Sequence, residues 1–218
     1  MLAFYRSTVG KKIIMAVTGI IGIAFVILHM AGNLQAFGGA AKLNGYAAIL
    51  HGPLAELILM QRVVLIAAVV LHVLMAWQLT ARSRAARPVG YVRRETQIAT
   101  FASRTMRWGG VLLLVFIVLH ILHFTTNDFQ PAGAFAAGDI YANVVGSFQI
   151  PWLTAFYVLA MVALGLHLYH GVWSSGRSLG VSPASRWPMR RRLALAIAVI
   201  VAAGFALVPL AAAFGLLR

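Results

Sequence analysis

Histidines inside apolar segments are the residues of this chain whose type and spacing could do chemistry. The clearest case is the stretch 163–174, in which His167 and His170 stand three residues apart and would share one face of a helix. Because an imidazole is costly to place in hydrocarbon, each one is expected to bind a metal, carry protons or hydrogen-bond a neighbouring helix. Six of the seven histidines lie in four apolar segments: His29, His72, His120, His123, His167 and His170.

The composition indicates that these histidines lie in a membrane. The chain has 218 residues, of which 61% are hydrophobic, and 18 lysines and arginines stand against four acidic residues. The basic residues occupy short segments between apolar runs, so membrane topology explains the formal charge of +14 better than nucleic-acid binding does. The absence of cysteine excludes disulfides, thiolate-bound iron–sulfur clusters and C-x-x-C-H haem attachment.

Five apolar runs have the length of about 20 residues that a helix needs to cross a bilayer. Backbone groups in hydrocarbon find no water, so these spans should be helical. We therefore expect one domain, residues 1–218, folded as an all-α bundle of five transmembrane helices. The first ten residues are too polar for the core of a signal peptide, so the first span should be retained. The expected spans are 13–37, 57–79, 108–126, 152–174 and 193–217.

The basic residues set an orientation for these spans. Fifteen of the 18 lysines and arginines lie in the N-terminal segment and in the loops after the second and fourth spans. The positive-inside rule therefore places the N-terminus in the cytoplasm and the C-terminus outside. The three remaining basic residues fall on the outer side: Lys42, Arg62 and Arg218.

Residue counts along the helices sort four histidines by depth. His72 and His167 each lie ten residues from the first arginine of a basic loop, which is ~15 Å along a helix. His29 and His120 lie seventeen and thirteen residues from the nearest preceding basic residue, which is roughly 20 to 25 Å. The sequence thus predicts two pairs on four helices, with His72 and His167 nearer the cytoplasm and His29 and His120 nearer the outside.

Two imidazoles from facing helices are the axial ligands of a six-coordinate b-type haem, and an apolar bundle shields its macrocycle. Such a site has no open coordination position, which suits electron transfer. A zinc site is less suited, because no carboxylate or thiolate lies near these histidines, and a proton relay would not require pairing by depth. His123 and His170 each lie one turn from a proposed ligand; by spacing alone either could replace it or could hydrogen-bond a neighbouring helix, the backbone or a haem propionate.

Four stretches resemble the cytochrome b membrane-anchor subunit of succinate dehydrogenases and fumarate reductases, in its single-anchor, two-haem class. They are S-T-V-G-K-K-I-I-M-A-V-T-G at 7–19, H-M-A-G-N-L-Q at 29–35, S-R-T-M-R-W-G-G at 103–110 and H-x-x-x-G-x-W-S at 167–174. The similarity covers nearly the whole chain. The H-x-x-x-G pattern implies His167 over His170, and the spacing from arginine to histidine implies His120 over His123. The haem b ligands that the resemblance implies are His29, His72, His120 and His167.

The resemblance also implies partners in a bacterial inner membrane. A flavoprotein with covalent FAD and an iron–sulfur protein would dock on the cytoplasmic face, and this chain would pass electrons between the iron–sulfur clusters and a quinone, commonly menaquinone. The rival functions are the cytochrome b subunit of another quinone-linked dehydrogenase or hydrogenase, and a proton-coupled transporter without redox chemistry. No inverted repeat supports the transporter.

Quinone reduction needs protons as well as electrons, and Glu56 is the candidate proton donor. This carboxyl group lies at the outer mouth of the second span, just after Pro53 and near His51. The competing location for the quinone is the cytoplasmic face near Ser103 and Arg104. Alternatively, Glu56 is a solvated carboxylate paired with Lys42.

Overall fold

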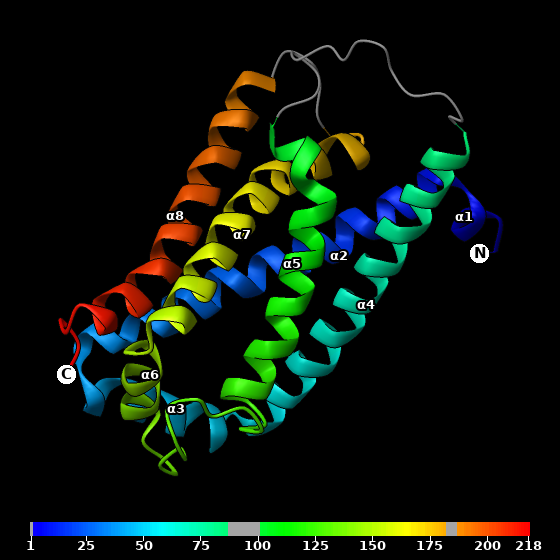
Figure 1. The fold of residues 1–218 in the computed structure, drawn as a ribbon. Coiled ribbons are helices and arrows are strands. Elements are labelled where there is room, and N and C mark those ends of the chain that lie inside the picture. The colour runs from blue at the N-terminus through cyan, green and yellow to red at the C-terminus, as the bar shows by residue number, and fades with distance from the viewer. Residues whose placement is uncertain (1, 87–100, 182–186) are drawn as a thin grey trace.

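The computed structural model describes residues 2–86, 101–181 and 187–218, and every regular element in these ranges is a helix (Figure 1). Five helices are long and apolar enough to cross a membrane, so the predicted all-α bundle of five membrane-spanning helices is confirmed. Parts of both basic loops, 87–100 and 182–186, lie outside the described residues. The five are α2 (Thr8–Asn33), α4 (Ala55–Ala85), α5 (Phe101–Phe124), α7 (Pro151–Ser178) and α8 (Trp187–Ala213).

The helices extend further toward the basic side than the apolar runs do. Helix α4 continues six residues past the expected end at 79, and α5 begins seven residues before the expected start at 108. Hydropathy marks only the hydrocarbon part of a span, whereas arginine is a good helix former and prolongs the helix into the interface. A short helix α1 (Leu2–Arg6) precedes α2, whose first turn is capped by the Ser7 hydroxyl, 2.8 Å from the Gly10 amide.

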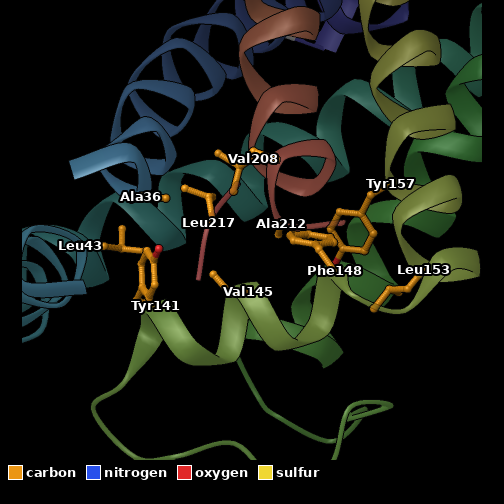
Figure 2. Close-up of a cluster of buried hydrophobic side chains, with 11 residues drawn as sticks. Ala36, Leu43, Tyr141, Val145, Phe148, Leu153, Tyr157, Val208, Ala212 and Leu217 are labelled. Carbon is orange, nitrogen blue, oxygen red and sulfur yellow. The ribbon is translucent and has the colours of Figure 1, made fainter. Parts of the chain in front are cut away.

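The outer end contains helices that do not span. A 3-10 turn, η1 (Leu34–Gly38), continues α2 and leads into α3 (Ala40–His51). The segment between the third and fourth spans contains a further short helix, α6 (Ile140–Phe148). Figure 2 shows Tyr141, Val145 and Phe148 pointing from α6 into a buried apolar cluster that includes Val208 and Ala212 near the end of α8 and Leu217 just beyond it.

The packing order of the long helices matters for the histidines. Helix α7 is central, since it packs against α8, α5 and α2, while α4 packs against α2. In the described ranges α4 makes little contact with α7, and α2 makes little contact with α5. The chain starts at one end of the bundle and finishes at the other, as five crossings require (Figure 1).

Candidate functional site

The inner pair joins His72 on α4 to His167 on α7, with ring centres 6.0 Å apart and ring planes inclined by 53°. The Nδ1 atom of His72 lies 3.1 Å from the carbonyl oxygen of Met15 and 3.3 Å from the Thr18 hydroxyl. A carbonyl only accepts, so Nδ1 of His72 carries the proton and donates it to Met15. The Nε2 atom of His72 therefore keeps its lone pair, as a metal ligand must.

Gly19 lets α2 approach the ring of His72. A Cβ atom at residue 19 would lie 3.3 Å from Cε1 of His72, which is tighter than ordinary van der Waals contact. Gly22, one turn further on, has no atom within 4 Å of such a Cβ. The small residue at 19 thus provides room for the imidazole.

One ring nitrogen of His167 lacks a hydrogen-bond partner among the described residues. Its Nδ1 atom is buried and has no hydrogen-bond partner in the part of the chain that the structure describes. A buried polar atom left in this way costs about 1–3 kcal/mol. A cavity of about 50 Å³ adjoins the ring, lined by α5 and α7 through Thr105, Met106, Gly109, Ala163 and Leu166.

The outer pair joins His29 on α2 to His120 on α5, with ring centres 5.9 Å apart and planes inclined by 76°. Aromatic rings enclose both imidazoles: Phe25 stacks on His29 at 5.2 Å, and Phe116 stacks on His120 at 5.6 Å. His29 lies ten residues beyond Gly19, so the two pairs are about 15 Å apart along α2. The structure therefore brings together the histidines that were expected to pair, at two depths.

A hydrogen-bonded chain behind the outer pair fixes the proton on His120. The Ser147 hydroxyl donates to the carbonyl oxygen of Asn143 at 2.7 Å, so the Ser147 oxygen accepts from Nε2 of His123 at 3.0 Å. Nδ1 of His123 then accepts from the Tyr157 hydroxyl at 3.0 Å, which leaves the Tyr157 oxygen to accept from Nδ1 of His120 at 3.4 Å. His120 thus also keeps a lone pair on Nε2.

His123 is fully buried, and its two nitrogens bond helices α6 and α7. This is the hydrogen-bonding role that the sequence left open beside ligation. His170 lies one turn from His167 and is half-buried, and it forms no hydrogen bond within the described ranges. His51 is exposed at the end of α3 and bonds the Ala47 carbonyl at 2.9 Å.

The structure places Glu56 in the first turn of α4 as an exposed side chain. Within the described ranges it forms no hydrogen bond and no ion pair with Lys42. A carboxylate at this position interacts favourably with the helix dipole. The structure does not bring Glu56 into contact with His29 or His120.

The separation of the ring centres in both pairs suits a metal between them. An imidazole nitrogen binds a metal at about 2.0–2.1 Å, so two imidazoles on opposite sides of one metal hold their ring centres roughly 6 Å apart. Each pair also bridges two helices that otherwise pack little against each other. In the described residues no three His, Cys, Asp or Glu side chains lie close enough together to hold a bare metal ion, so each pair offers two protein ligands and no third.

Sequence reasoning missed Tyr157 and Ser147, because hydrogen bonding across three helices depends on how each helix is rotated. Asp139 was the one available sign of α6, since its side chain accepts from the Ala142 amide at 3.0 Å as an N-cap. Comparison of the chain with family models, curated proteins and solved structures found no match.

Proposed function

We propose that this chain is the di-haem cytochrome b anchor of a succinate:quinone oxidoreductase in a bacterial inner membrane. The observation that carries the proposal is that each histidine pair, at metal-binding separation, joins two helices that otherwise pack little against each other. A planar cofactor between those helices would use both imidazoles of a pair and connect the two helices. The motifs at 7–19, 29–35, 103–110 and 167–174 support the choice of family.

When bound, each haem b would supply reversible one-electron chemistry at its iron. The residues of this chain hold and orient the group. His72 and His120 present Nε2 because their Nδ1 protons are directed to Met15 and Tyr157. Phe25 and Phe116, which stack on His29 and His120, would help to exclude water, and two protein ligands on each iron would leave no position for oxygen.

The proposed partners are a flavoprotein that carries FAD and an iron–sulfur protein, docked where the arginine-rich ends of α4, α5, α7 and α8 face the cytoplasm. This chain would pass electrons between the iron–sulfur protein and menaquinone or another quinone. The chain itself would not oxidise succinate.

An absorption spectrum of the purified protein, oxidised and then reduced with dithionite, tests the proposal. We expect two b-type haems per chain, with one lost in His72→Ala or His167→Ala and the other lost in His29→Ala or His120→Ala. His51→Ala is the matched control and should retain both, because His51 is exposed on α3. Protein purified with its native cofactors that contains no haem would overturn the proposal and favour the transporter. Loss of a haem in His170→Ala but not in His167→Ala would reassign the ligand on α7.

Glu56→Gln tests the proposed proton donor, because it keeps the shape of the side chain and removes its ability to bind and release a proton. If Glu56 protonates quinone, quinone-linked turnover of the complex should fall by about 10²–10⁴-fold, the usual contribution of a general acid or base. Both haems and succinate oxidation with a soluble dye acceptor should persist. Unchanged quinone turnover would remove Glu56 from the mechanism and favour the cytoplasmic location near Arg104.

A further inference from the structure

A second cluster of functional side chains lies at the basic end of α7 and α8, away from both histidine pairs. The indole of Trp173 is buried, and the Cζ atoms of Arg177 and Arg191 lie 5.2 and 4.8 Å from its ring centre. Arg177 also lies 5.0 Å from the ring centre of Trp187. Stacking on an indole holds a guanidinium in place and leaves its in-plane N–H groups available to an anion.

The chain supplies few carboxylates for these arginines. No Asp or Glu occurs after Asp139, so neither α7 nor α8 carries one. Of the four acidic residues only Glu95 falls on the expected cytoplasmic side, against fifteen lysines and arginines, and its position lies outside the described residues. The Nε atom of Arg191 is buried without a hydrogen-bond partner in the described part of the chain. The counter-charge is therefore expected from another molecule.

An open apolar groove of about 490 Å³ begins one helical turn from this cluster. Tyr169 lies four residues from Trp173 on α7, and Leu195 lies four residues from Arg191 on α8, so the groove continues on the same faces of both helices. Helices α7 and α8 pack closely at the floor of the groove, because a Cβ atom at Gly165 would lie 3.2 Å from the Cβ atom of Ala202. Residues of α5, α7 and α8 line the groove, and Val162 on α7 and Val199 on α8 lie among them.

We propose that this cluster and groove form a binding site for one anionic phospholipid of the cytoplasmic leaflet. Arg177 and Arg191 bind the phosphate, and one acyl chain lies in the groove between α7 and α8. From Trp173 to Val162 is eleven residues, about 16 Å along α7, which accommodates much of an acyl chain. Charge complementarity selects an anionic headgroup, since basic sites between helices on the cytoplasmic side suit such lipids. The proposal does not depend on haem binding.

The test uses the whole protein, purified with its native cofactors, delipidated and reconstituted in nanodiscs that contain phosphatidylcholine with one fifth phosphatidylglycerol. Native mass spectrometry should detect one retained phosphatidylglycerol per chain, and a photoreactive acyl chain should label α7 and α8. Arg191→Gln should weaken retention about tenfold, because it removes charge-assisted hydrogen bonds. Arg191→Lys should weaken it less, and Val199→Trp, which fills the groove from its exposed side, should reduce labelling without altering charge.

Arg192→Gln is the matched control, since it removes the same charge from the adjacent, exposed position and should change retention by less than about twofold. Equal retention of phosphatidylcholine, or equal losses in Arg191→Gln and Arg192→Gln, would overturn the site. So would normal lipid retention in Arg191→Gln together with loss of the inner haem, which would assign the arginine to the cofactor. If Arg191→Gln does not fold, unchanged lipid labelling in the folded Val199→Trp variant would overturn it as well.

Discussion

At the scale of single residues, the direction of hydrogen bonds determines what each imidazole offers its partner. The Asn143 carbonyl cannot donate, and this fixes every proton in the chain through Ser147, His123 and Tyr157 to His120. On the inner side, the Met15 carbonyl does the same for His72 in one step. His29 has no such partner in the described ranges, so its orientation depends on the stacked ring of Phe25.

Tyr157→Phe should destabilise the protein, and it should also remove the hydrogen bond that holds the ring of His120 in place. The substitution leaves Nδ1 of the fully buried His123 without a donor, which costs about 1–3 kcal/mol. Thermal unfolding in detergent should detect the loss, and the haem of the outer pair should show a shifted reduction potential. Tyr169→Phe is the control, since Tyr169 forms no hydrogen bond in the described part of the structure. An unchanged melting temperature and potential would contradict this direction of hydrogen bonding.

Gly19→Val should disturb the inner pair selectively. The added side chain meets the ring of His72, which must then tilt away from His167 and from the Met15 carbonyl. We expect loss or spectral change of one haem while the outer one is retained. Gly22→Val, where the space around Cβ is open, should leave both haems unchanged. Similar spectra for the two variants would show that Gly19 is not needed for the close approach.

At the scale of helices, the short outer helix α6 depends on its capping contacts. Asp139 accepts from the Ala142 amide and from the side chain of Asn44 on α3, both at 3.0 Å. The Asn44 oxygen in turn accepts from the Tyr141 amide at 2.9 Å. One carboxylate and one amide thus connect α3 to α6 across 95 residues of sequence.

Asp139 should make the stability of the outer end depend on pH. The hydrogen bonds from the Ala142 amide and the Asn44 side chain lower the pKa of Asp139 from its ordinary value of 3.8. Because the folded pKa is the lower one, the stabilisation is complete above the ordinary value and is lost as the pH falls through the lowered pKa. Asp139→Asn keeps a cap but not the charge, so melting temperatures measured from about pH 5 to pH 3 should fall less in this variant than in the wild type. Parallel curves would contradict the prediction.

The sequence was sufficient to predict the five spanning helices, because length and apolarity alone determine them. It was not sufficient for α6, because nine residues are too few to form a span, and Gly133 and Gly138 just before them are typical of a loop. Counting residues from the nearest lysine or arginine predicted which histidines share a depth, because the rise per residue of a helix is constant. It could not give the contact of Tyr157 with both His120 and His123, since that depends on helix rotation and tilt.

At the scale of the whole molecule, the predicted orientation has a direct test, since the chain contains no cysteine. Ser83→Cys lies in the last turns of α4 and Thr126→Cys just beyond α5, both at exposed positions at opposite ends of the bundle. An impermeant thiol reagent added to intact cells should label only Thr126→Cys. A second cytoplasmic probe, Ser182, lies outside the described residues. Labelling of Ser83→Cys instead would invert the topology.

The apolar cluster at the outer end also constrains the order of synthesis. It packs α6 against Val208, Ala212 and Leu217, which lie in or just beyond α8 and are therefore translated after the other four spanning helices (Figure 2). Until the final span has been translated and inserted, Tyr141 and Phe148 have no apolar partner on that side. The outer end therefore stays open during translation, after all the histidines have been made, and closes only when the last helix arrives.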